Sequence, residues 1–335
     1  MAPDGGNVGP DEEAELATRA AWLYYAGSFT QAEISQRLNI APAKAHRLIA
    51  RAAREGLVRV FIEGPTAGCI ALERVIASRF GLDFCRVVPD LGEAGLPLRA
   101  LGRATAAYLR GALEAGRHRI IGVGHGRTLA AGVADLPRAA YPNLCFVSLL
   151  GGLPRRVSAN PFDVIHRLAE KTGAEAYLMP VPFYANTAAD RAVLLAQRGV
   201  AEALSIAATA TLFAIGIGEV TEGAFLSASE MVAPDEVAEV RRAGAIAEML
   251  GRYYDTSGKL VDTTLHERVI ALDPEVMRGR EVLAVAGGSG KVLAIAAALR
   301  SHLLSALITD EPTARRLVEL DGPSAKTRHK TSKGE

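Results

Sequence analysis

The chain has 335 residues, which is enough for two domains at roughly 100 to 200 residues each. Apolar residues make up 49% of it and the formal net charge is +1, so a large core is available and no strong overall field favours nucleic acid or membrane. No run of about 18 apolar residues predicts a membrane span, and the polar, acidic start predicts no secretion signal.

Residues 1–17 contain five acidic residues and no base, whereas residues 28–60 contain six bases and two acids, a net charge of +4. A basic segment inside a nearly neutral protein predicts a small surface that binds an anion. Residues 1–10 and the polar, basic stretch 321–335 are expected to be disordered.

Residues 11–64 predict a DNA-binding domain that begins with two short helices. The first helix is expected from 14 to 26, ending at Gly27. Its expected apolar face is Leu16, Ala20, Leu23 and Tyr24. Thr30 and Glu33 then predict a capping box at the start of the second helix, because the hydroxyl and the carboxylate can each accept a hydrogen bond from a free backbone amide.

A third helix is expected from 43 to 54, after a proline at a position that a first helical turn tolerates. Its expected apolar face is Ala45, Leu48, Ile49 and Ala52. Gly56 ends the helix, and the alternating "LVRVFI" at 57–62 predicts one strand of a small wing. A short helix, a tight turn and a basic second helix are typical of a helix-turn-helix, whose second helix enters the major groove of DNA.

The alternative for this segment is a small helical bundle with a solvated basic face. If it binds DNA, Lys44 and Arg47 are expected at base edges or phosphates, and Arg51 and Arg54 at phosphates. The full set of candidate contacts is Thr30, Gln31, Lys44, His46, Arg47, Arg51 and Arg54. Two-fold symmetric sites normally require a dimer.

The three cysteines, Cys69, Cys85 and Cys145, are scattered along the rest of the chain. They fit neither a disulfide framework nor a zinc site, which indicates a cytoplasmic protein. We expect neither a metal nor a cofactor.

Residues 65–320 predict an α/β domain of Rossmann-like alternation. An amphipathic helix at 69–82 and a strand at 84–90 come first. Further strands are expected at 119–124, 144–152, 176–183, 211–218, 281–288 and 303–310. Helices are expected at 127–135, 162–171, 188–197, 291–299 and 312–320. Continuous apolar strands that alternate with helices predict a parallel sheet covered on both faces.

Ligands of such sheets bind beyond the carboxyl ends of the strands, which selects the loops "GHGRT", "GGLPR", "GIGEV" and "GGSGK". The last loop is not a Walker A motif, because the required first glycine falls at Val285 and the required hydroxyl at Val292. "GVGHGR" is not a dinucleotide fingerprint either, because Arg127 replaces the third glycine.

The chemistry of these loops favours a phosphate or a polyhydroxylated ligand. A helix N-terminus after "GVGHGR" offers backbone amides, Arg127 and Thr128, and Lys291 adds a mobile charge on a second loop. The alternative is that the glycines only turn the chain and Lys291 is solvated. The candidate contacts are Gly124, His125, Gly126, Arg127, Thr128, Gly288 and Lys291.

Carboxylates would help to hold a polyol, because one carboxylate can accept hydrogen bonds from two neighbouring hydroxyls. Glu248 and Asp255 are the candidates. The alternatives, equally open, are a solvent-facing helix residue at Glu248 and a turn former at Asp255.

As a connected series, these motifs resemble the SorC family of sugar-responsive transcription regulators, from about residue 14 to about residue 320. The matching pieces are "TQAEISQRLNIAPAKAHRLIARAAREGLV", "GVGHGRTL", "LLGGLPR", "LMPVPFYANTAADRAVLLAQ", "GIGIGE", "GRYYDTSGKLVD" and "VAGGSGKVLAIAAALRSHLLSALITDEPTARRLV". Within the family, the chain is most similar to regulators of polyol operons, particularly erythritol catabolism. Many members have Ser-Trp where this chain has Gly124 and His125, a substitution that we expect to mark a different effector.

The resemblance implies a dimer or tetramer that binds an operator, as a repressor, and changes its DNA affinity when a sugar, a polyol or a phosphate of either binds. It also implies an effector domain with the sugar-phosphate isomerase fold. The family's anion-holding positions fall on Gly126, Arg127, Thr128 and Lys291, with Glu248 and Asp255 near the hydroxyls.

Two other classes of function are open. A sugar-phosphate isomerase or deaminase with a helical extension would need a general base and a second acid or base opposite it. Glu219 and Glu222 are present, but the paired Asp and His expected of the deaminases are not, so we expect no catalytic residue. An oligomeric binding protein without DNA contact would be unaffected in promoter binding by loss of Lys44 and Arg47.

Overall fold

In a computed structural model of the chain, the structure describes residues 10–58, 67–152, 163–221 and 232–320. The chain divides into two compact units, Met1–Gly64 and Pro65–Glu335, and each is described by itself. Several expected features lie outside the described residues: most of the wing, both chain ends, residues 153–155 of "GGLPR", and Glu222.

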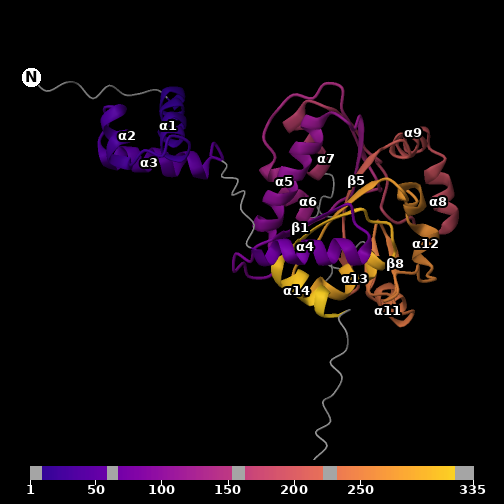
Figure 1. Cartoon of the computed structure of the whole chain (residues 1–335). Coiled ribbons are helices and arrows are strands. Elements are labelled where there is room, and N and C mark those ends of the chain that lie inside the picture. Colours follow the sequence, from indigo (N-terminus) through magenta and orange to yellow (C-terminus); the bar gives the residue numbers. More distant parts are fainter. Residues whose placement is uncertain (1–9, 59–66, 153–162, 222–231, 321–335) are drawn as a thin grey trace, which may run out of the picture. The chain divides into compact units, whose positions relative to one another are not determined.

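The first unit consists of α1 (Pro10–Tyr25), α2 (Gln31–Arg37) and α3 (Pro42–Arg54) (Figure 1). The apolar face predicted for α3 is confirmed. The core of the first unit is made of Ala17, Ala20 and Ala21 of α1, Ile34 of α2, and Ala45, Leu48, Ile49 and Ala52 of α3. Small alanines at the contact let α1 and α3 approach closely.

Two details of the first helix differ from the expectation. The helix begins at Pro10 rather than 14, and Tyr24 is 38% exposed instead of facing the core. Leu16 and Leu23 are only partly buried, because the three alanines supply the contact with α3.

The capping box predicted at the start of α2 is confirmed. The Thr30 amide and hydroxyl both donate to Glu33 Oε2, each at 2.7 Å, and the Glu33 amide donates to Thr30 Oγ1 at 3.4 Å. These contacts fix where the chain turns into the helix.

The second unit is built on a seven-stranded sheet in which all strands are parallel. Its strands are β1 (Phe84–Val88), β2 (Ile120–Val123), β3 (Cys145–Ser148), β4 (Glu175–Tyr177), β5 (Leu212–Gly216), β9 (Glu281–Val285) and β10 (Ala306–Asp310). Their order is β1-β10-β9-β5-β2-β3-β4. The predicted α/β class with a parallel sheet is confirmed.

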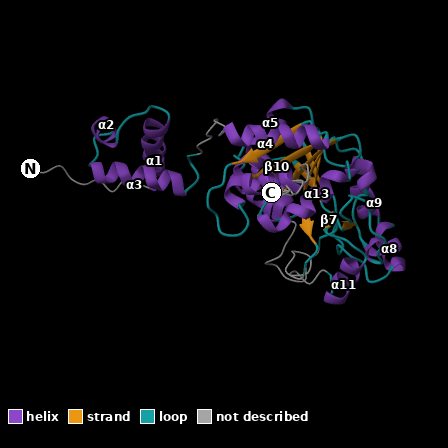
Figure 2. Cartoon of the chain, turned by 60° about the horizontal axis from the view of Figure 1, so that its bottom comes forward, coloured by secondary structure: helices purple, strands orange, loops and turns teal. Residues whose placement is uncertain are grey.

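In the strands other than the short edge strand β4, alternate residues belong to two separate cores, one on each face of the sheet. In β5, Phe213 and Ile215 face one core, and Leu212 and Ala214 the other. Helices on the first face are α4 (Ala67–Phe80), α9 (Arg198–Ala207), α11 (Pro234–Arg242), α13 (Val292–Arg300) and α14 (Glu311–Leu320). The second face is covered by α5 (Leu98–Ala115), α6 (Arg127–Asp135) and α7 (Asp163–Thr172), which lie together in Figure 1. Figure 2 shows the strands of this unit in orange among its purple helices.

A smaller antiparallel sheet, β6 (Gly218–Glu219), β7 (Ala247–Met249) and β8 (Arg252–Tyr254), extends from the end of β5. Gly218 pairs with Glu248 in it. Two further short helices, α8 (Ala188–Leu195) and α12 (Leu265–Arg268), and two 3-10 turns, η2 (Pro274–Met277) and η3 (Ser289–Lys291), complete the described elements.

Candidate effector site

Loops from three adjacent strands meet at the carboxyl edge of the large sheet. From β2 the chain moves outward to β3, whereas from β5 it moves the opposite way to β9, so a crevice is expected between β2 and β5. A cavity of about 60 Å³ lies there. Its lining residues are Leu96, His125, Gly126, Arg127, Thr128, Leu150, Gly216, Ile217, Gly218, Glu219, Glu248, Leu250 and Lys291. This volume is well below the roughly 300 Å³ typical of pockets for drug-sized ligands, so the site suits a compact guest.

Six of the nine residues expected at the effector line this cavity, and three do not. His125, Gly126, Arg127, Thr128, Glu248 and Lys291 lie together, although they come from three distant parts of the chain. Gly124 lines a second, smaller cavity beside His125 instead. Asp255 and Gly288 line neither.

The N-terminus of α6 forms one wall. Gly126 is its N-cap residue, and no side chain caps this helix end among the described residues. Arg127, the first helical residue, is exposed. Thr128 Oγ1 donates to the Val285 carbonyl at 2.8 Å, so this hydroxyl proton joins α6 to β9. What the wall offers a ligand is therefore the helix N-terminus and the Arg127 guanidinium.

Lys291 approaches from the opposite loop, directly before α13. Its Nζ donates to the Ile217 carbonyl at 2.6 Å. Burial lowers the pKa of Lys291, while the nearby Glu219 carboxylate acts in the opposite direction. The ammonium group is thus held inside the cavity by the chain segment between β5 and β6.

Glu248 is the buried carboxyl group of the site. It lies in β7 with 8% exposure, so a solvent-facing helix position is excluded. Its Oε1 accepts a hydrogen bond from the Gly251 amide at 2.5 Å. A Cβ atom at Gly218 would lie 2.5 Å from its Oε2, so the glycine leaves room for the carboxyl group. Burial raises the pKa of Glu248 to about 7, an effect that the Gly251 amide and Lys291 oppose.

His125 is a neutral ring in this environment. Burial lowers its pKa to about 4. The ring stands edge-on to Phe183, with ring centroids 5.4 Å apart. A neutral imidazole offers one donor and one acceptor, which suits hydroxyl groups.

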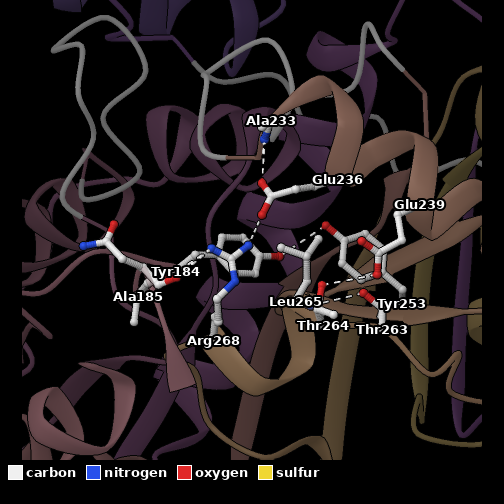
Figure 3. Close-up of polar contacts among 11 residues, drawn as sticks. Tyr184, Ala185, Ala233, Glu236, Glu239, Tyr253, Thr263, Thr264, Leu265 and Arg268 are labelled. Atoms are coloured by element: carbon white, nitrogen blue, oxygen red, sulfur yellow. Dashed lines mark hydrogen bonds and ion pairs between the residues drawn. The ribbon is translucent and has the colours of Figure 1, made fainter. Parts of the chain in front are cut away.

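A polar network behind β8 supports the hairpin that carries Glu248. Tyr253 and Tyr184 lie with their hydroxyl oxygens 3.2 Å apart (Figure 3). The Tyr253 amide donates to His266 Nε2 at 2.9 Å, and burial lowers the pKa of His266 to about 4. Arg268 joins the Ala185 carbonyl to Glu236 of α11. These contacts hold β8 against α12, and α12 against α11.

Asp255 forms a turn and does not take part in the site. Its Oδ1 accepts hydrogen bonds from the Ser257 hydroxyl at 2.7 Å, the Ser257 amide at 2.8 Å and the Lys259 amide at 3.0 Å. These bonds lower the pKa of Asp255, beginning with that of the Ser257 side chain. The structure therefore gives Asp255 the turn-forming alternative, and it lines neither cavity.

Gly288 also serves the fold rather than the ligand. Its amide donates to Asp310 Oδ2 at 2.8 Å and to Thr313 Oγ1 at 3.0 Å. It is consequently not available as an anion donor.

Sequence reasoning did not single out Glu219 or the apolar lining residues as effector contacts. The loop "GIGEV" is among the four selected loops, but its carboxylate is considered only for catalysis. Leu150 lies in the motif "LLGGLPR", but nothing in the sequence connects it with Leu96 or Leu250, and only the folded chain brings the three leucines to one cavity.

In the first unit, the candidate DNA contacts divide into two groups. His46, Arg47 and Arg54 are exposed on α3, and Lys44 is half-buried. Arg51 instead pairs with Glu55 at 2.7 Å and Glu13 at 2.8 Å, so its charge is neutralised within the unit. Thr30 and Gln31 lie at the N-terminus of α2, where the Thr30 hydroxyl is engaged in the capping box.

Among the described residues, no three His, Cys, Asp or Glu side chains are grouped so as to hold a metal ion. Within the same part of the chain, every helix is too short or too polar to cross a membrane.

Comparison with known proteins gives consistent matches over both units. A family model described as "Putative sugar-binding domain" matches residues 64–319. The erythritol catabolism regulatory protein EryD of Brucella abortus is 49% identical over 308 residues, covering 92% of this chain and 98% of that protein. The transcriptional regulator LsrR of an Enterobacter species is 30% identical, covering 92% and 94%.

Solved structures show the same architecture. The full-length sorbitol operon regulator SorC of Klebsiella pneumoniae aligns with a TM-score of 0.74 at 24% identity, covering 91% of this chain and 98% of that one. The sugar-binding domain of a transcriptional repressor from Vibrio fischeri aligns with a TM-score of 0.66 at 26% identity, over 75% of this chain and 98% of that domain. These relatives are named as regulators and not as enzymes.

Proposed function

Because this chain belongs to the SorC family of transcription regulators, we propose that it represses a polyol catabolic operon and that a small polyol of the erythritol class controls its operator affinity. The polyol binds in the cavity between the loops after β2, β5 and β9. The regulator is a cytoplasmic homo-oligomer that presents one α3 from each of two copies to a two-fold symmetric operator.

The charged side chains around the cavity are the observation from which we infer the class of ligand. Glu219 and Glu248 face the same space as Arg127 and Lys291. Carboxylates accept hydrogen bonds from hydroxyls, whereas two of them beside a phosphate dianion would repel it. The paired charges and the neutral His125 therefore favour an uncharged, hydroxyl-rich ligand over its phosphate. The small cavity volume and the name of the 49% identical relative support the same class.

The proposal is tested by thermal shift with four- to six-carbon polyols and their phosphates, together with fluorescence anisotropy on the operator. A ligand that binds only the folded state raises the melting temperature with its concentration. We expect the largest shift from a free tetritol, and the same compound to change operator affinity. A shift with phosphorylated compounds alone would contradict the ligand class.

Lys291→Met tests the site itself. A lost hydrogen bond from a charged donor lowers affinity about 10- to 100-fold, so the variant should no longer respond to the polyol while its operator affinity stays unchanged. Lys259→Met, which removes an exposed lysine of the same unit, is the matched control. A normal polyol response in Lys291→Met would show that this loop does not bind the effector.

A further inference from the structure

Residues 287–290 form the glycine turn that precedes Lys291. Two buried side chains, Asp310 and Thr313, hold this turn by hydrogen bonds. Asp310 Oδ2 accepts hydrogen bonds from the Gly288 amide at 2.8 Å and from the Thr313 hydroxyl at 2.7 Å. Thr313 Oγ1 also accepts from the Gly288 amide at 3.0 Å, and the Thr313 amide donates to Asp310 Oδ1 at 3.1 Å. Both residues are buried, with exposures of 3% and 0%.

The fit between this pair and the turn leaves no room for another side chain. A Cβ atom at Gly287 would lie 2.2 Å from Asp310 Oδ2. Gly288 has φ of +99°, a conformation that favours glycine, and a Cβ atom there would lie 3.1 Å from Leu96. The path of the backbone is therefore set by Asp310 on one side and by the segment before α5 on the other.

A short chain of hydrogen bonds connects this pair to the effector cavity. The Gly288 amide is bound by Asp310 and Thr313, and the Gly288 carbonyl accepts the Lys291 amide at 2.9 Å. From that backbone position, Lys291 Nζ reaches the Ile217 carbonyl at the cavity wall. Neither Asp310 nor Thr313 lines the cavity, so they cannot touch a ligand there.

We propose that Asp310 and Thr313 are positioning residues for Lys291, which fix the glycine turn so that the ammonium group is held ready for the effector. This inference rests on the proposed function of the cavity. A turn held in one conformation loses little entropy when the ligand binds, so the pair increases effector affinity without contacting the effector.

The test compares three threonine variants by polyol titration, using tetritol binding measured by calorimetry. Thr313→Val removes the hydroxyl that bonds both Gly288 and Asp310, at nearly constant volume. We expect polyol affinity to fall about 5- to 10-fold, because the Gly288 amide keeps only its hydrogen bond to Asp310 and the turn loses part of its support. Thr313→Ser restores the hydroxyl and should recover most of the affinity.

Thr309→Val is the matched control. Thr309 lies one residue before Asp310 in β10, is fully buried, and its hydroxyl has no hydrogen-bond partner among the described residues. The same chemical change should therefore leave polyol affinity unaltered. Operator affinity in the absence of polyol should be equal for all variants, which separates positioning from loss of the fold.

A positioning role also predicts that the effects of Thr313→Val and Lys291→Gln on polyol affinity are not additive. In a Lys291→Gln background, where the group to be positioned is absent, Thr313→Val should cause less than a twofold further loss of polyol affinity. Equal affinity in wild type and Thr313→Val, or a full additional loss in the Lys291→Gln background, would overturn the inference. If the wild type itself bound no polyol, the proposed function would fail as well, and the two failures are thus distinguished.

Discussion

A carboxyl group that is buried beside a ligand cavity makes both stability and binding depend on pH. The pKa of Glu248 is about 7 in the folded chain against an ordinary value of 4.5, because burial disfavours its charged form. The folded state therefore holds the proton more tightly than the unfolded state. The stabilising contribution of the protonated group is complete below about pH 4.5 and is lost as the pH rises through 7.

Glu248→Gln should accordingly flatten the stability profile between pH 5 and pH 8. The two pKa values correspond to a change of up to about 3 kcal/mol in the free energy of unfolding across that range. Urea unfolding of the wild type and the variant at several pH values measures it. Parallel profiles for the two proteins would show that Glu248 does not titrate in this range.

Effector affinity should rise with pH, whereas the stabilising contribution of Glu248 falls. Polyol hydroxyls donate to the ionised carboxylate, so affinity rises as Glu248 loses its proton and should be about tenfold weaker at pH 6 than at pH 8. Calorimetric titrations at both pH values, with Glu248→Gln as the pH-independent control, check this sign.

Glu248 and Asp255 also show what a sequence can and cannot reveal about single residues. Both were equal candidates as carboxylates that can accept hydrogen bonds from neighbouring hydroxyls. Asp255 is followed by the small and turn-forming residues that satisfy it locally, so its alternative role was visible in the sequence. The role of Glu248 depends on its pairing with Gly218, thirty residues away, which no local pattern encodes.

At the scale of the element, α3 carries the exposed Arg47, the half-buried Lys44 and one arginine, Arg51, that is already paired. Lys44→Gln with Arg47→Gln should weaken operator binding tenfold or more and lower the salt slope of log affinity by about two, roughly one for each lost phosphate contact. Anisotropy titrations at several salt concentrations measure both quantities.

Arg51→Gln is the matched control on the same helix. Because Arg51 is bound by Glu13 and Glu55, its loss should lower the melting temperature of the first unit and leave the salt slope nearly unchanged. If Arg51→Gln flattened the slope as strongly as the double variant, the ion pairs would have to open on the operator.

Elements with strong periodicity were predictable, and those set by distant contacts were not. The helix expected at 127–135 is α6, and the capping box of α2 is present. The strand expected at 176–183 is limited to β4, because Pro180 and Pro182 lack the backbone donors that a ladder needs. The three short strands β6, β7 and β8 have two or three residues each, too few to show any period.

At the scale of the whole molecule, alternation of apolar strands with helices was enough to predict the parallel sheet, and the carboxyl-edge rule was enough to select the loops that form the cavity. The resemblance to the SorC family is confirmed by the matches over both units. Strand order was not predictable from periodicity, yet it decides which of the four loops meet. Only the reversal between β2 and β5 brings Arg127, Glu219 and Lys291 to one cavity.

Within the second unit, a series of contacts leads from the glycine turn through α14 to α4. Asp310, which binds the glycine turn, also caps the start of α14 through the Thr313 amide. Arg79 of α4 donates to the Leu317 and Val318 carbonyls near the end of α14. In sequence, α4 is the first described element after the DNA-binding unit. A change in the turn can thus reach α4, which follows the first unit in sequence.

Arg79→Gln should therefore separate sensing from response. Polyol affinity should remain within about twofold of the wild type, because Arg79 lies away from the cavity. The polyol-induced change in operator affinity should shrink several-fold, which is within the coupling energies of about 1 to 3 kcal/mol usual between two sites. Arg74→Gln, which replaces another exposed arginine of α4, is the control. Calorimetry with the polyol and anisotropy on the operator, with and without polyol, measure the two effects. An undiminished operator response in Arg79→Gln would mean that coupling does not pass through the contact between α4 and α14.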